Sequence, residues 1–168
     1  MDNNHIRIEM ATDADVPLIL SFIRELAQYE RLLDRVHATE GRLRESLFGS
    51  RRLAEAIIAY RNDEPVAFAV YFFNFSTFEG RPGLYLEDIF VRPAFRRSGI
   101  GRQLFAYLAN KAQESGCSRI ELSVLNWNEE AIRFYNRLEA EPVQEWTVFR
   151  LSADALKKLG SNALPGHL

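Results

Sequence analysis

The stretch VRPAFRRSGIG, residues 91–101, joins an apolar run to a segment with helical periodicity. It contains two glycines, Gly99 and Gly101, and arginines lie in and beside it. The first N–H groups of an α-helix have no partner within the helix and point along its axis with the positive end of the helix dipole. Glycine has no Cβ, so an anion can approach such a backbone closely. The stretch therefore indicates either a phosphate-binding corner or a turn with solvated arginines.

Two familiar phosphate-binding motifs do not match this corner. A P-loop requires a lysine and then a serine or threonine after its last glycine, whereas Arg102 and Gln103 follow Gly101. The dinucleotide fingerprint requires a third glycine where this chain has Leu104, and it normally follows the first strand of a domain. Neither class of nucleotide-binding protein is therefore predicted.

Strand-like and helix-like segments lie on both sides of the corner. Short apolar or alternating runs predict strands, and apolar residues three and four positions apart predict helices. The order β-α-α-β-β-β-α-β-α-β predicts an α/β (α+β) fold with a mixed, mostly antiparallel central sheet flanked by helices. The run 65–75 is apolar enough for burial on both faces, and a loose tail is expected at 161–168. The expected strands are 5–10, 53–60, 65–75, 84–91, 119–125 and 146–151, and the expected helices lie within 12–32, 38–50, 101–115, 128–138 and 152–160.

The composition suits one globular domain, residues 1–168. Hydrophobic residues make up 47% of the chain and the net charge is −2, so no overall positive field favours nucleic acid. No run approaches the roughly 18 apolar residues of a membrane span, and the N-terminus has no secretory pattern. The single cysteine, Cys117, excludes an internal disulfide, and the three histidines lack ligand spacing. We therefore expect a cytoplasmic protein without a metal, a nucleic-acid partner or a membrane partner.

The sequence around the corner resembles a known family. VRPAFRRSGIG matches V-x-P-x-x-R-x-x-G-x-G, the acetyl-CoA diphosphate loop of the GCN5-related N-acetyltransferase (GNAT) superfamily. ELAQYE at 25–30, LYLEDIFV at 84–91 and WNEEAIRFY at 127–135 are similar to its diamine (spermidine/spermine) N-acetyltransferase branch. The resemblance implies acetyl transfer from acetyl-CoA to a primary amine of a small basic acceptor, namely a polyamine, a diamine or a lysine-like amino acid. It also implies direct attack in a ternary complex, and a homodimer.

The resemblance assigns contacts with acetyl-CoA to two parts of the chain. One is the glycine corner together with the end of the strand before it, where the contacts are made by the backbone. The other is the start of the helix within 128–138, where Asn128 also suits an N-cap followed by acidic residues, and the two roles are compatible. The expected contacts are Ile89, Phe90, Val91, Arg96, Arg97, Ser98, Gly99, Ile100, Gly101, Arg102, Asn128 and Ala131.

Acetyl transfer to an amine requires a proton acceptor. A primary amine has a pKa near 10.4, so removing its proton at pH 7 costs roughly 4.6 kcal/mol. Glu87 and Asp88 lie inside an apolar strand, and strand alternation predicts that they point to opposite faces. Either Glu87 accepts the amine proton, directly or through water, or one acid faces solvent while the other pairs with an arginine. The resemblance favours a catalytic Glu87, and we predict a structural role for Asp88.

The departing thiolate requires a proton donor. By spacing alone, Tyr135 belongs to a stripe with Ala131, Phe134 and Leu138, which is typical of core packing. The resemblance instead identifies Tyr135 as the proton donor to the coenzyme sulfur. A phenol with a pKa near 10 loses about 1.5 units, or roughly 2 kcal/mol, when it protonates a thiolate of pKa near 8.5. That difference is small enough for the transfer to proceed.

Several acidic residues suit a small cationic acceptor. Tyr29 and Glu30 also fit a solvated helix end, and Glu121 fits a solvent-facing strand position. Glu139 stands where the family usually has a glycine, and the stretch 141–146 is shorter than in the diamine branch, so the sequence does not specify the amine. By resemblance, the acceptor groove is lined by Tyr29, Glu30, Glu87, Glu121, Leu122 and Ser123.

Two other functions remain open at this point. A non-catalytic acyl-CoA sensor on the same fold would need the glycine corner but not Glu87 and Tyr135. A protein or peptide N-acetyltransferase would need an open peptide groove, which the apolar stretch 71–78 and the acidic residues suit less well. Cys117 has no obvious base beside it in the sequence, so an acyl-enzyme is not expected.

Overall fold

The computed structural model describes residues 5–161, and its contacts divide the chain into two compact units. The first ends at Ser123, the second begins at Val124, and each is described here by itself. The expectation of a single domain stays a prediction. Within residues 5–161, no helix has both the length and the apolar character needed to cross a bilayer.

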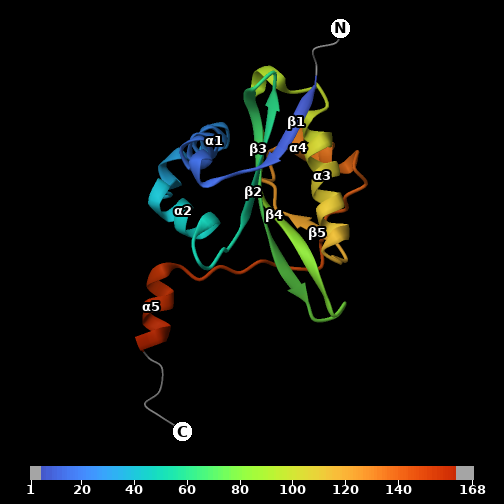
Figure 1. The fold of residues 1–168 in the computed structure, drawn as a ribbon. Helices are drawn as coiled ribbons and strands as arrows, with labels where there is room; N and C mark the ends of the chain where they lie inside the picture. The colour runs from blue at the N-terminus through green and yellow to red at the C-terminus, as the bar shows by residue number, and fades with distance from the viewer. Residues whose placement is uncertain (1–4, 162–168) are drawn as a thin grey trace. The chain divides into compact units, whose positions relative to one another are not determined.

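The first unit is built on a five-stranded sheet in which strands consecutive in sequence are neighbours in space (Figure 1). The first four strands pair antiparallel, and the fifth runs parallel to the fourth. The connection between those last two strands carries a helix, as a parallel pair requires. The predicted mixed, mostly antiparallel sheet is therefore confirmed. The strands are β1 (Ile6–Met10), β2 (Glu55–Arg61), β3 (Glu64–Ser76), β4 (Arg81–Val91) and β5 (Ile120–Leu122).

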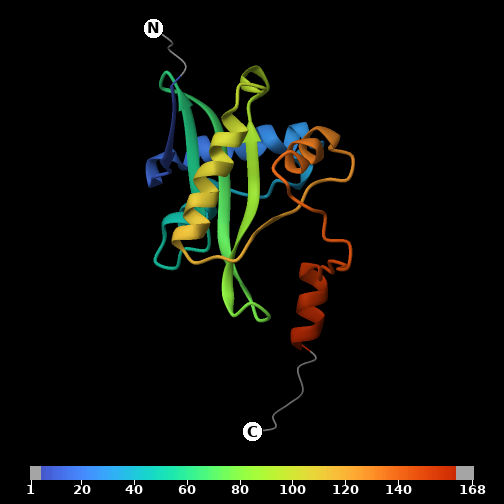
Figure 2. The same cartoon turned by 90° about the vertical axis from the view of Figure 1, so that its right-hand side faces the viewer.

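Helices cover both faces of this sheet (Figure 2). On one face, Ile19 and Phe22 are fully buried, and the Phe22 ring stacks on Phe68 of β3 with 5.1 Å between centroids. On the other face, Leu104 and Leu108 are buried in a second cluster. The helices are α1 (Val16–Tyr29) and α2 (Glu40–Phe48) on the first face and α3 (Ile100–Glu114) on the second, with 3-10 turns η1 (Asp13–Asp15), η2 (Leu33–Arg35) and η3 (Pro93–Phe95).

β3 is buried on both faces over only half of its length. From Val66 to Tyr71 every residue is buried, as the apolar run predicts. Beyond Tyr71 the strand continues into a hairpin with β4, where Phe73 and Phe75 are 39% and 64% exposed. The expectation of two-sided burial for 65–75 is therefore wrong for its second half. Apolar composition alone does not tell where the covering helices end.

The second unit contains α4 (Glu129–Asn136) and α5 (Ala153–Ser161), both in predicted positions. The predicted strand 146–151 is wrong: it joins no ladder among the described residues, and Val148 and Phe149 are 86% and 90% exposed. A strand needs a hydrogen-bonded neighbour, which the apolar pattern of WTVFRL cannot supply by itself. The order of elements is therefore the predicted one without its last strand. Of the expected loose tail, Ser161 belongs to α5 and 162–168 lie outside the described residues.

Glu139, at the position where the resemblance implies a glycine, adopts a left-handed backbone conformation. Its φ is 62°. The N–H groups of Ala140 and Glu139 donate to the carbonyls of Tyr135 and Asn136, at 3.1 and 3.0 Å, which is the hydrogen-bond pattern of a Schellman motif at the end of α4. The helix thus ends as it would with glycine, but a residue with a Cβ is strained there.

Candidate functional site

The glycine corner has the geometry that its sequence predicts. β4 ends at Val91, and Gly99 is the N-cap of α3 with a φ of 85°, a conformation that glycine adopts without strain. A Cβ built on Gly99 would meet no other atom within 4 Å, so this side of the backbone is open to a ligand. Ile100 is buried and anchors the first turn of α3 in the core. Ser98 steadies the loop, because its hydroxyl donates to the Phe95 carbonyl at 2.5 Å.

The arginines of the glycine corner differ in exposure and in their contacts. Arg97 and Arg102 are exposed, at the open N-terminal end of α3, where their charge adds to that of the helix dipole. Arg96 is half-buried, and its Nε donates to the Val91 carbonyl at 3.0 Å. Its guanidinium carbon lies 4.4 Å from the centroid of the Tyr29 ring, at the end of α1. The contacts of Arg97 and Arg102 with a diphosphate stay a prediction, and Arg96 lies against the end of α1.

The end of β4 has a free edge within the sheet. β5 pairs with β4 only at Leu84, Tyr85 and Leu86, so beyond Leu86 no described strand pairs with that side of β4. Ile89, Phe90 and Val91 lie along this edge, and their side chains pack into the two cores. Backbone N–H and C=O groups along an unpaired edge can bind an extended amide-containing chain. This arrangement agrees with the predicted backbone contacts, which stay a prediction.

A β-bulge separates the two adjacent carboxylates. Asp88 pairs with Val70 of β3 but Leu86 pairs with Tyr71, so Glu87 is an extra residue in β4. Residues paired across antiparallel strands point to the same face. Val70 belongs to the core under α1, so Asp88 faces α1, whereas Leu86 and Tyr71 face α3. The pairing establishes the face of Asp88 but not that of the extra residue Glu87, so the predicted opposite orientation of the two carboxylates stays a prediction.

Burial and neighbouring charge perturb Asp88 strongly. Burial, followed by the charges of Glu87 and Glu30, raises the pKa of Asp88 from its ordinary value of 3.8 to about 6. Burial also raises the pKa of Glu30, the residue that ends α1. Since Glu87 and Glu30 both raise the pKa of Asp88 through their charge, the three acids lie near one another, and a proton or another cation bound among them would relieve their repulsion. The bulge and the end of α1 therefore form an electronegative site, which we call the carboxylate site (Glu30, Glu87 and Asp88).

The predicted acceptor residues on β5 are already engaged within the chain. The Glu121 carboxylate accepts a hydrogen bond from the Asn74 amide at 3.0 Å and lies 3.0 Å from Arg119 Nε. Burial raises the pKa of Glu121, but these two partners outweigh burial and lower it. Leu122 packs on the α3 side, and the Ser123 hydroxyl lies 2.7 Å from the Tyr85 hydroxyl. The acceptor role of these residues stays a prediction.

In the second unit, α4 carries the other predicted site residues. Asn128 is buried, and its Oδ1 accepts the N–H of Ala131 at 3.2 Å, which confirms the N-cap. Tyr135 is half-buried, with its ring 5.6 Å from that of Phe134. These contacts are compatible with both core packing and a catalytic phenol. The roles of Asn128, Ala131 and Tyr135 therefore stay predictions.

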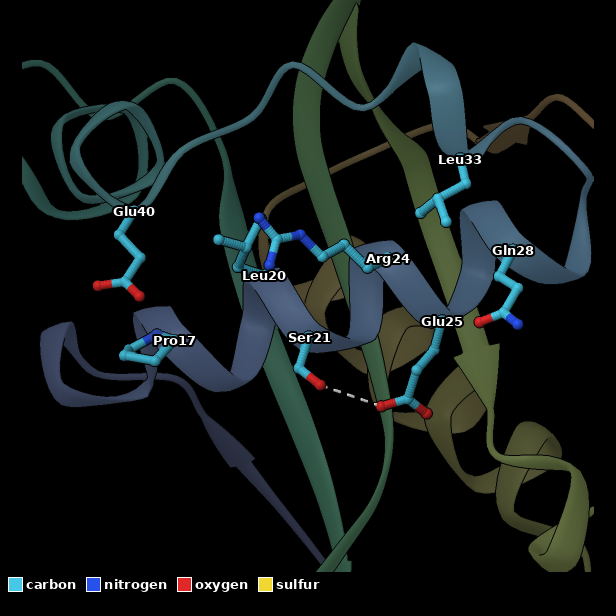
Figure 3. A pocket seen from close by; sticks show the side chains of 8 residues that line it. All are labelled: Pro17, Leu20, Ser21, Arg24, Glu25, Gln28, Leu33 and Glu40. Carbon is cyan, nitrogen blue, oxygen red and sulfur yellow. Dashed lines mark hydrogen bonds between the residues drawn. The ribbon is translucent and has the colours of Figure 1, made fainter.

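A pocket of about 300 Å³ lies along α1 (Figure 3). Inside it the Ser21 hydroxyl donates to Glu25 at 3.2 Å, and Glu25 also binds Arg92. None of the predicted site residues lines this pocket, so it is not the predicted site. Its lining residues are Pro17, Leu20, Ser21, Arg24, Glu25, Gln28, Leu33 and Glu40.

Sequence reasoning missed two features of the site. One is Asp88, whose signal was present, because a charged residue in an apolar strand needs a partner or a function. The other is the bulge, which no glycine or proline marks in LYLEDIFV. Among residues 5–161, no group of three His, Cys, Asp or Glu side chains is placed to hold a metal ion.

Comparison with known proteins agrees with this geometry. The sequence pattern of the acetyltransferase (GNAT) family matches residues 21–139. A thialysine N-epsilon-acetyltransferase of Bos taurus is 36% identical, over 92% of this chain and 96% of its own. An L-ornithine N5-acetyltransferase of Arabidopsis thaliana is 30% identical, over 91% and 87%. The solved structure of an integron cassette protein from V. cholerae is 25% identical, with a TM-score of 0.78, over 94% of this chain and 98% of its own.

Proposed function

The chain belongs to the acetyltransferase (GNAT) family, in its diamine acetyltransferase branch, and from this premise we propose that its acceptor is the terminal amine of a lysine-like or ornithine-like amino acid. It is an N-acetyltransferase that acts on small amines, with acetyl-CoA as the family's acetyl donor. The named relatives act on thialysine and on L-ornithine. Each of these two amino acids has an amine at the end of a short side chain. Polyamines and diamines are the second candidates.

One observation supports the proposal: the second half of β4 joins the carboxylate site to the glycine corner. The carboxylate site lies at the bulge, the free strand edge follows it, and the glycine corner follows the end of the strand. An amine held at Glu87 is thereby next to a chain that runs along Ile89–Val91. The diphosphate of that chain would bind the N-terminus of α3, with Arg97 and Arg102.

The proposed reaction is a direct transfer. Glu87 accepts a proton from the ammonium, directly or through water, while Glu30 and Asp88 hold the positive charge of the acceptor. The free amine nitrogen then forms a bond to the thioester carbonyl carbon, and the carbon–sulfur bond breaks. Tyr135 gives its proton to the departing thiolate, and the second proton, which the nitrogen loses as the amide forms, returns to the Tyr135 phenolate directly or through water. No acyl-enzyme is needed, and burial raises the pKa of the Cys117 thiol, which disfavours that residue as a nucleophile.

The test is thiol release from acetyl-CoA with a panel of amines. The panel contains thialysine, ornithine, lysine, spermidine, short diamines and a lysine-containing peptide. We expect turnover with the amino acids, less with the polyamines and none with the peptide. Turnover with the peptide alone would replace the proposal by a protein acetyltransferase. If no amine of the panel is acetylated while coenzyme A still raises the melting temperature, the proposal would be replaced by that of an acyl-CoA sensor.

A second proposal concerns the quaternary structure and the location. In the second unit an extended segment and one side of α5 carry exposed apolar residues, namely Val143, Trp146, Val148, Phe149, Leu151, Leu156 and Leu159. Exposed apolar area of this kind is typical of a protein interface. We propose that a second copy of the chain covers it in a cytoplasmic homodimer. Sedimentation should show a dimer at micromolar concentration that Phe149→Asp weakens, and a monomeric wild type would refute the dimer.

A further inference from the structure

Two arginines flank η3, at the beginning of the glycine corner, and both contact α1. Arg92 binds Glu25 through two hydrogen bonds, from Nε to Oε2 at 3.0 Å and from Nη2 to Oε1 at 2.8 Å. Its guanidinium carbon lies 4.6 Å from the centroid of the Phe22 ring, and its Nη1 donates to the Pro65 carbonyl at 2.7 Å. The hydrogen bond from Arg92 lowers the pKa of Glu25. Arg92 therefore attaches the end of β4 firmly to the middle of α1.

Arg96 makes the corresponding contact three residues beyond Pro93. Its Nε donates to the Val91 carbonyl, and its guanidinium lies over the Tyr29 ring at 4.4 Å and near the Phe90 ring at 5.6 Å. A planar guanidinium over an aromatic face is attracted by the ring quadrupole, more strongly when both groups are partly desolvated. Arg96 therefore connects the glycine corner to the last residue of α1.

The partners of the two arginines lie on one face of α1. Phe22, Glu25 and Tyr29 stand at positions i, i+3 and i+7, a spacing that aligns side chains along a helix. Glu30, which belongs to the carboxylate site, follows Tyr29 directly and ends the helix. The contacts on α1 thus lead from the glycine corner to the acceptor side.

We propose that Arg96 is a positioning residue that couples acetyl-CoA binding in the glycine corner to the arrangement of the acceptor wall at Tyr29 and Glu30. The inference rests on the proposed function. Acetyl-CoA that orders the corner also holds Arg96 in place, and Arg96 holds the Tyr29 ring. A ligand that orders a shared element lowers the entropic cost of binding the second ligand, and the effect is reciprocal. Coenzyme and amine should therefore strengthen each other's binding.

Hydrogen exchange of the full chain tests the coupling with coenzyme A alone. In the wild type, saturating coenzyme A should slow exchange both in residues 95–102 and at the end of α1, residues 26–32. In Arg96→Gln it should slow exchange only in 95–102. Arg97→Gln is the matched control: it weakens coenzyme affinity, but at saturation both segments should slow. Equal slowing at the end of α1 in wild type and Arg96→Gln would overturn the inference.

Kinetics with the best amine of the panel provide the second test. Arg96→Gln and Tyr29→Leu should each raise KM for the amine by roughly tenfold, and the double variant should be no worse than the poorer single variant. Arg96→Lys, which keeps the charge but not the planar group, should be intermediate. Arg96 would be only a ligand of the diphosphate if Arg96→Gln raised KM for acetyl-CoA and not for the amine. The same conclusion would follow if the increases in KM of the two single variants multiplied in the double variant. Wild-type protein that binds no coenzyme A would refute the proposed function instead.

Discussion

The glycine corner and the two β4 members of the carboxylate site, Glu87 and Asp88, lie at the two ends of one short segment, residues 87–101, yet they differ in origin. The corner depends on local features: a strand end, a glycine with a φ of 85° and the first turn of α3. The carboxylate site depends on register, because the position of Asp88 follows from its pairing with Val70 on another strand. A loop that leads into a helix can thus be encoded locally, whereas the face to which a carboxylate inside a strand points depends on the sheet.

The largest effect on catalysis is expected from a substitution of Glu87, because it should impair the chemical step without weakening coenzyme binding. Glu87→Gln removes the proposed proton acceptor and nearly keeps the side-chain volume. It should lower kcat by about a hundred- to ten-thousandfold and leave KM for acetyl-CoA unchanged. Steady-state thiol release at pH 7 measures both. If kcat stays within twofold of the wild type, the proton leaves by another route, and the carboxylate site only binds.

Asp88 should reduce stability because its charge is partly buried and lies near other acids. A raised folded-state pKa means that the folded protein binds the proton more tightly than the unfolded one, so stability falls as pH rises from about 4 to 6. Asp88→Asn should therefore stabilise the protein at pH 7 by up to about 3 kcal/mol, and this gain should vanish near pH 4. Denaturant unfolding of both proteins at the two pH values measures it. A gain independent of pH would contradict a charge effect.

A substitution of Gly99 tests the glycine corner, at the other end of residues 87–101. Gly99→Ala places a Cβ in open space but strains the backbone at positive φ by about 1–2 kcal/mol. The corner should then lose roughly tenfold in affinity for coenzyme A, while kcat changes little. Calorimetric titration with coenzyme A provides the affinity. Gly41→Ala is a suitable control, since it also adds a methyl group in open space, at a helical position without positive φ. Equal losses in both variants would contradict the argument.

The smallest effect is expected at Glu139, which holds the left-handed conformation without glycine. Glu139→Gly removes the strain and should stabilise the protein by about 1 kcal/mol, reduced by the greater chain entropy of glycine. Thermal unfolding measures the change. Glu141→Gly, at a position without positive φ, is the matched control and should not stabilise. If both variants destabilise, the Schellman end of α4 is not strained.

Prediction from the sequence was most successful where neighbours along the chain decide the structure. The helix starts at Gly99 and Asn128, the stop after α3 and the antiparallel pairing of β2, β3 and β4 follow from spacing, caps and turns. Prediction failed where a distant partner decides. The run 146–151 has strand-like residues but no ladder among the described residues, and Phe75 lies beyond the cover of the helices.

The sequence by itself determined the glycine corner, the order of elements up to α4 and the family to which the chain belongs, because these depend on residue types at fixed spacing. Only the tertiary structure decided that Glu87 is an extra residue in β4, that Asp88 lies partly buried on the side of α1 and that Arg96 lies against Tyr29. Each of these facts is a contact between residues far apart in the chain. Such contacts depend on register and packing, which no local pattern of residues specifies.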